Sequence, residues 1–161
     1  MKSSVFKKEN ILKKIIMVST NNTCRSFIAE SILRQYLLDA DQKNVEVISR
    51  GLVVLFPEPV HVKAADMVIK TCGIESLDFR SAQLTQEEVE ESDLILTMTE
   101  EQKDKILEEY HGYKEIATLN EYARVEGAII DPYGMEDDDY ERCFEPVSYT
   151  HLRAHETSAH L

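Results

Sequence analysis

Residues 14–38 read KIIMVSTNNTCRSFIAESILRQYLL, and this stretch decides the fold. The apolar run at residues 15–18 is typical of a buried strand, while apolar residues recur at helical spacing between residues 28 and 37. Between these two patterns lies the short polar segment STNNTCRS, residues 19–26. The order predicts a strand, a tight loop and a helix, with the loop at the carboxyl edge of a parallel sheet, where ligands of open α/β sheets bind.

The loop has the features of an anion-binding site. Five residues separate Ser19 from Arg25, a spacing at which a nucleophile and an arginine can hold one phosphate. Successive backbone N–H groups would form a nest, and the helix N-terminus adds partial positive charge. Arg25 adds a planar fork for two phosphate oxygens. The residues expected to surround the phosphate between these two are Thr20, Asn21, Asn22, Thr23 and Cys24.

The alternative is an ordinary turn that caps a helix, because an S-x5-R string also arises by chance. The strand before the loop, the helix after it and the distant Asp-Pro-Tyr-Gly turn at residues 131–134 favour a phosphate loop.

Composition limits the partners. The 161 residues fit one domain, and 30 acidic against 18 basic residues give a net charge of −12. This field opposes nucleic acid and anionic membranes, so we expect neither as a partner, and any phosphate must be held by local geometry. No apolar run approaches the ~20 residues that span a bilayer. The three cysteines fit neither a disulfide framework nor a zinc pattern, which favours a reducing, cytoplasmic location.

Strand-like and helix-like segments alternate along the chain. We expect strands near residues 14–18, 45–49, 93–98 and 116–119, and helices near 27–38, 62–71, 85–91, 100–110 and 137–144. With right-handed crossovers, this alternation predicts an α/β fold, a three-layer αβα sandwich around a four-stranded parallel sheet in the order 2-1-3-4.

The domain is predicted to span residues 14–145, between two atypical ends. Residues 1–13 are basic and lack the apolar stretch of a signal peptide, so we expect a disordered arm. Residues 146–161 hold three of the five histidines and show no core-facing period, which predicts a foreign tail dispensable for folding. His151 and His155 could share a helix face, but no partner stands at a fixed offset, so we expect no metal.

The chain resembles the low molecular weight protein-tyrosine phosphatases of the small bacterial type, which have the phosphotyrosine protein phosphatase I-like fold. The resemblance runs from about residue 15 to residue 144 and is carried by residues 18–26, 49–52, 73–74, 80–84, 93–99 and 131–134. It places the family's nucleophilic cysteine on Ser19 and its phosphate-gripping arginine on Arg25. It also places the hydroxyl that supports the thiolate on Ser26, the general acid on Asp131 and the aromatic flanking the substrate ring on Tyr133.

Serine at position 19 is expected to stop the family's reaction. In that reaction a thiolate attacks phosphorus, a phosphocysteine forms, and the general acid protonates the leaving group and later activates water. A hydroxyl stays protonated near neutral pH unless a base lies beside it, and the motif supplies none. Asn21, Phe27 and Met135 depart from the family pattern as well. These departures favour a natural pseudophosphatase over an engineered trapping mutant, with a sequence error as the third explanation.

Three functional classes follow from this resemblance, and none needs a cofactor. The first is a hydrolase-family protein phosphatase inactivated at its nucleophile, and the second is a module that binds a phosphorylated protein or a small aryl phosphate without turnover. The third, an arsenate reductase, needs further cysteines just after the third strand, and residues 97–103 contain none. Thr23 resembles the threonine of bacterial protein-arginine phosphatases, so phosphoarginine stands beside phosphotyrosine as the candidate substrate.

Overall fold

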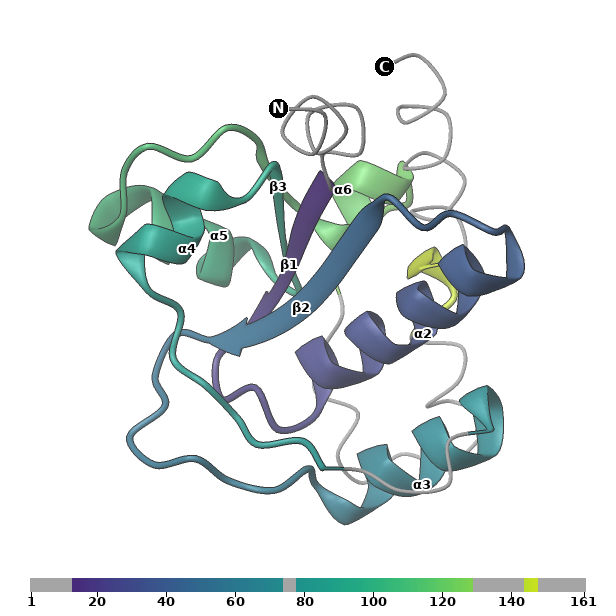
Figure 1. Cartoon of the computed structure of the whole chain (residues 1–161). Helices are drawn as coiled ribbons and strands as arrows, with labels where there is room; N and C mark the ends of the chain where they lie inside the picture. The colour runs from purple at the N-terminus through teal and green to yellow at the C-terminus, as the bar shows by residue number, and fades with distance from the viewer. Residues whose placement is uncertain (1–12, 74–77, 129–143, 148–161) are drawn as a thin grey trace, which may run out of the picture.

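The computed structural model describes residues 13–73, 78–128 and 144–147. Its centre is a four-stranded sheet in the order β2-β1-β3-β4, built from β1 (Lys13–Ser19), β2 (Val45–Gly51), β3 (Leu94–Thr97) and β4 (Ile116–Thr118) (Figure 1). All three pairings are parallel. The strand order predicted from the sequence is therefore confirmed.

Helices cover both faces of this sheet, as Figure 1 shows. On one side lie α2 (Arg25–Asp39) and α3 (Val62–Cys72), and on the other lie α4 (Gln86–Glu91) and α5 (Glu100–Glu109). Alternate residues of β1 serve the two faces, as the pleat of a strand requires. Ile15 and Met17 pack in the cluster with α2, while Ile16 and Val18 pack in the cluster with α4 and α5. The predicted three-layer sandwich is confirmed. None of the helices in the described ranges is both long and apolar enough to cross a membrane.

Short sequence signals set several helix boundaries. Thr85, Thr99 and Thr118 each form a capping box with the glutamate or glutamine three residues later, which satisfies exposed N–H groups at the start of α4, α5 and α6 (Leu119–Ala123). We did not predict α6, although its Thr-Leu-Asn-Glu start carries the same signature as the other two. Gly73 ends α3 in the left-handed conformation, which glycine adopts without steric cost.

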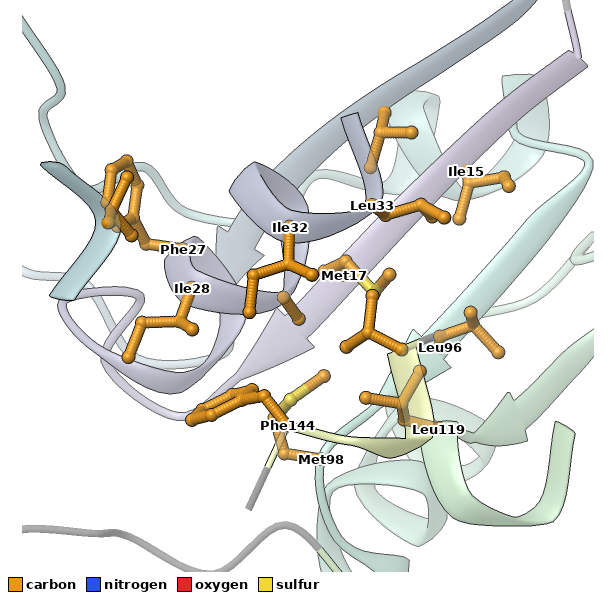
Figure 2. Packing of buried hydrophobic residues seen from close by; sticks show 14 of the residues in the cluster. Ile15, Met17, Phe27, Ile28, Ile32, Leu33, Leu96, Met98, Leu119 and Phe144 are labelled. Atoms are coloured by element: carbon orange, nitrogen blue, oxygen red, sulfur yellow. The ribbon is translucent and has the colours of Figure 1, made fainter. Parts of the chain in front are cut away.

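The larger core cluster reaches beyond the predicted end of the domain. Phe144 belongs to the packed interior together with Met98 (Figure 2). Val147, which follows the predicted boundary at residue 145, is fully buried in the same cluster. The packed core therefore includes at least the first part of the segment that the sequence assigned to a foreign tail. The predicted final helix at residues 137–144 lies almost entirely outside the described residues.

Side chains from α2 and β2 occupy backbone carbonyls along the edge of the sheet that β2 forms. Arg34 donates from Nε and Nη2 to the Val47 carbonyl, at 2.9 and 2.7 Å. Arg50 donates from Nη1 to the Ser49 carbonyl at 2.7 Å. Occupied carbonyls leave fewer acceptors for another strand, so the edge is blunted against unwanted pairing.

A buried carboxyl supports the same junction between α2 and β2. Glu30 accepts a 2.6 Å hydrogen bond from the Ser49 hydroxyl and lies 3.3 Å from Nη1 of Arg34. Burial raises the pKa of Glu30, opposed by the hydrogen bond from Ser49 and the charges of Arg34 and Arg50.

Candidate phosphate-binding site

The 19–26 loop lies where the sequence predicted it, between the carboxyl end of β1 and the start of α2. The N-terminus of α2 has no side-chain cap: Cys24 precedes the helix without making a capping hydrogen bond, and the first turn contains no acidic residue. The first regular helical bond runs from the Ile28 N–H to the Cys24 carbonyl at 2.9 Å. The earlier N–H groups at this end, together with the partial positive charge of the helix, suit an anion.

Ser19 is buried at the base of the loop. Among the described residues, its side chain forms hydrogen bonds only with neutral groups. It is 2% exposed. Its Oγ lies 2.6 Å from Oγ of Ser26 and accepts from the Asn22 backbone N–H at 3.2 Å. Neither a hydroxyl nor a backbone amide removes a proton from serine near neutral pH. Among the described residues, these contacts provide no general base for Ser19.

Asn22 organises the loop from inside. Its backbone has φ of +59°, in the left-handed region that asparagine tolerates better than most residues. Its fully buried side chain accepts from the Ala82 N–H at 3.0 Å through Oδ1 and donates to Ser26 Oγ at 2.8 Å through Nδ2. Both polar atoms of the side chain are thus hydrogen-bonded within the protein. The side chain therefore supports the loop, and other groups must contact an anion.

This geometry changes the significance of one departure from the family pattern. Besides Ser19, Asn21 is the departure that lies within the loop itself. Asn21 is exposed and is not among the residues with positive φ, whereas its neighbour Asn22 is. Phe27, the other departure close to the loop, is buried and packs against Phe79 with ring centroids 4.5 Å apart.

The loop's carbonyls are occupied by the segment that follows β2. The carbonyls of Ser19 and Thr20 accept from the N–H groups of residues 52 and 53 at 3.1 and 3.0 Å, and the Thr23 carbonyl accepts from the His61 N–H at 2.9 Å. Three acceptors that would repel an anion are thereby held away in bonds to a neighbouring segment. The nest of N–H groups itself stays a prediction from the sequence.

Two residues far along the chain also support the loop, and sequence reasoning missed their roles. Gly51 lies so close that a Cβ there would stand 3.0 Å from the Thr20 carbonyl oxygen. Gln102 donates to Oγ1 of Thr20 at 3.1 Å while its Oε1 accepts from the Met98 and Thr99 N–H groups. Gly51 stood in a stretch that matched the family, but no local pattern revealed what it approaches.

The structure brings together only part of the predicted site. Ser19, Arg25 and Ser26 share the strand–loop–helix junction, and Arg25 is the half-buried first residue of α2. Asp131 and Tyr133, the predicted acid and ring-flanking aromatic, lie outside the described residues. Within the described ranges, no three His, Cys, Asp or Glu side chains gather closely enough to hold a metal ion.

Comparison with known proteins identifies the class to which this strand–loop–helix arrangement belongs. The family model described as "Low molecular weight phosphotyrosine protein phosphatase" matches residues 14–155. The chain therefore belongs to that family. A curated relative, the low molecular weight protein-tyrosine-phosphatase PtpB of Staphylococcus haemolyticus, is 36% identical over 136 residues, which cover 84% of this chain and 93% of PtpB.

Solved structures agree with this membership. The low molecular weight protein tyrosine phosphatase of T. tengcongensis is 31% identical, with a TM-score of 0.79 over 90% of this chain and 99% of that one. A mutant of the YwlE arginine phosphatase is also 31% identical, with a TM-score of 0.75 over 88% of this chain and 94% of its own. That mutant carries serine in place of a cysteine, and its active-site serine is phosphorylated.

Proposed function

We propose that the 19–26 loop binds phosphoryl groups carried by proteins or small aryl compounds, and that the chain does not hydrolyse them repeatedly. One observation carries the proposal: Ser19 lies buried at the base of the loop, in contact with Ser26 and Asn22, and none of its hydrogen-bond partners among the described residues is a base. The anion-binding groups are the backbone, the helix N-terminus and Arg25, and none of them depends on a thiol.

The phosphorylated residue is phosphotyrosine or phosphoarginine. Family membership supports phosphotyrosine, and Thr23 together with the likeness to an arginine phosphatase supports phosphoarginine. Binding of matched peptides that differ only in this residue would separate the two substrates.

Calorimetric titration with inorganic phosphate at moderate salt tests the binding site. The protein as written should bind, and Arg25→Ala should weaken binding by roughly two to four orders of magnitude, because two charge-assisted hydrogen bonds of about 1.5–3 kcal/mol each are lost. Arg80→Ala is the matched control: it removes the same charge from an exposed position and should change the affinity little. If Arg25→Ala binds phosphate as well as the parent, the loop is not the binding site.

Turnover of p-nitrophenyl phosphate tests the nucleophile. The Ser19 form should show negligible steady-state activity, and Ser19→Cys should restore measurable activity because a thiolate needs no separate base. Substantial and equal activity in both forms would contradict the argument.

A second candidate function is a phosphoryl acceptor that reacts once. The phosphorylated serine of the YwlE mutant favours it, because the resemblance places the family's nucleophile on Ser19. The Ser19 Oγ–P bond would form as the bond from phosphorus to the leaving group breaks, and the hydroxyl proton would pass to a phosphate oxygen. Expelling Ser19 again would require an alkoxide to leave, which is a far poorer leaving group than a thiolate, so the phosphoserine would persist.

Intact mass spectrometry distinguishes the two candidates. After incubation with p-nitrophenyl phosphate, a binding module keeps its mass and releases no p-nitrophenol. A single-turnover acceptor gains one phosphate at Ser19 and releases about one equivalent of p-nitrophenol. Ser19→Ala, which keeps the loop but removes the hydroxyl, should abolish the gain in mass and serves as the control.

A further inference from the structure

A cavity lies between α2 and the edge of the sheet that β2 forms, apart from the phosphate loop. Its volume is about 570 Å³, which is within the roughly 300–1,000 Å³ usual for small-molecule sites. One stripe of α2, from Phe27 to Leu38, lines it, and β2 lines it with Ile48 and Arg50. All of the 19–26 loop is described, and none of its residues lines this space. We call it the α2–β2 cavity.

The edge of β2 beside the cavity presents hydrogen-bond donors in place of acceptors. An edge strand ordinarily exposes both N–H and C=O groups. Here the Val47 carbonyl accepts from Arg34 at 2.9 and 2.7 Å, and the Ser49 carbonyl accepts from Arg50 at 2.7 Å. Arg50 also donates through Nε to Glu88 at 2.7 Å. Each guanidinium has more N–H groups than its hydrogen bonds to described residues engage, so donors remain for a ligand.

Glu30 shows that this edge can hold a carboxyl group. Its side chain lines the cavity, accepts from the Ser49 hydroxyl at 2.6 Å and lies 3.3 Å from Nη1 of Arg34. Burial raises the pKa of Glu30, which lowers the cost of placing a second anion nearby. Arginines outnumber carboxyl side chains among the residues that line the cavity. The lining therefore favours an anion over a cation, in a chain whose net charge is −12.

Apolar side chains provide a second contact surface in the same cavity. Phe27 and Phe79 both line it, and their ring centroids lie 4.5 Å apart. Leu38 also lines it and is 71% exposed, so its side chain is available to a ligand. Apolar walls with a few converging polar groups are typical of sites for small organic molecules.

We propose that the α2–β2 cavity binds a small organic anion, a carboxylate attached to a hydrocarbon or aryl group. The carboxylate accepts hydrogen bonds from Arg34 and Arg50, and the apolar group lies against Phe79 and Leu38. The inference goes beyond the proposed function, because it needs neither a phosphoryl group nor any residue of the 19–26 loop. Inorganic phosphate has no apolar group to bury here, so we expect phosphate to bind in the loop and leave the cavity to the carboxylate.

Two acids and their neutral amides test the class of ligand. Phenylpropionate and hexanoate would each be compared with the matching amide by backbone-amide NMR titration of the parent protein, with inorganic phosphate in excess. Each acid should bind about tenfold or more tightly than its amide, because the amide loses the charge-assisted hydrogen bonds. The resonances that shift should belong to α2, β2 and residues 78–80, which line the cavity.

Three variants test the location of the ligand. Gln35→Trp places a large side chain in the cavity, leaves both arginines in place and should abolish binding of the acids. Thr71→Trp is the matched control: it adds the same side chain at an exposed position of α3 and should bind the acids as the parent does. Arg34→Gln removes one guanidinium and should weaken binding by about tenfold or more. Thermal unfolding would verify that each variant is folded, and if Arg34→Gln is not, the two tryptophan variants decide.

The outcomes that would overturn the proposal are distinct from a failure of the phosphate site. If neither acid binds more tightly than its amide, or if Gln35→Trp binds the acids as well as Thr71→Trp does, the cavity is not a carboxylate site. If excess phosphate displaces the acids, or if the shifted resonances belong to residues 19–26, the acids occupy the phosphate loop and the proposal is wrong. Phosphate titration of Arg25→Ala remains the separate test of the proposed function.

Discussion

Replacement of Asn22 should reveal how much of the loop's stability depends on one side chain. Asn22→Ala removes the acceptor of the Ala82 N–H and the donor to Ser26 Oγ. A partly buried N–H left without an acceptor costs about 1–3 kcal/mol, and the second lost hydrogen bond costs about 1 kcal/mol. Alanine in left-handed backbone adds about 1–2 kcal/mol. We expect a loss of about 3–6 kcal/mol, a large part of the ~5–15 kcal/mol that stabilises a typical domain.

Two further variants separate the causes. Asn22→Gly loses the same two hydrogen bonds but accepts left-handed backbone, so it should be about 1 kcal/mol more stable than Asn22→Ala. Asn21→Ala changes an exposed residue without positive φ and should stay within about 0.5 kcal/mol of the parent.

Urea unfolding at neutral pH would measure all four proteins, provided that the slope of free energy against urea stays constant. If Asn22→Ala is as stable as Asn21→Ala, the buried network around Asn22 does not hold the loop. If Asn22→Gly and Asn22→Ala unfold at the same midpoint, the left-handed backbone contributes nothing measurable.

Three further outcomes are expected. Burial raises the pKa of Glu30 in the folded state, so the contribution of Glu30 to stability falls as pH rises above about 4.5. The unfolding free energy of Glu30→Gln should therefore increase relative to that of the parent as pH rises. Parallel pH profiles of the two proteins would contradict this. A chain that keeps Val147 but lacks residues 149–161 should retain the thermal midpoint of the parent. Removal of Val147 as well should lower the unfolding free energy by about 1.5–3 kcal/mol, because Val147 is fully buried. A large drop in the midpoint of the first truncation would mean that the rest of the tail packs. Gly51→Ala should weaken phosphate binding in calorimetry, because its Cβ would lie against the Thr20 carbonyl of the loop. Gly73→Ala is the control: no atom lies within 4 Å of its Cβ, so it should strain only the end of α3. Equal phosphate affinities in the two variants would exclude a role for Gly51.

The sheet and the position of the loop could be predicted because their signals are local. The apolar run before Ser19, the helical period after Arg25 and the alternation of later segments need only neighbouring residues to be recognised. Parallel strands and right-handed crossovers then leave few arrangements, and the order 2-1-3-4 was among them.

The internal support of the loop could not be predicted because it depends on contacts far apart in sequence. Ala82 lies 60 residues from Asn22, and Gln102 lies 82 residues from Thr20. No local pattern decides which of two adjacent asparagines takes the left-handed conformation. The buried Val147 was missed for a related reason: a single apolar residue after a proline shows no period, and only the packed core reveals its place.

The contacts of Ser19 explain why binding and catalysis should be separable at this site. The Asn22 N–H and the Ser26 hydroxyl surround the atom at position 19, and Nδ2 of Asn22 donates to Ser26. Because Ser26 Oγ accepts this hydrogen bond from Asn22, the Ser26 hydroxyl proton is available to point toward position 19. Two donors at that position would lower the pKa of a thiol. The same donors bring a serine hydroxyl no closer to ionisation near neutral pH, because its intrinsic acidity is too low. The surroundings therefore suit an anionic nucleophile that the present side chain does not supply, and restoring that one atom is the change from which we expect activity to return.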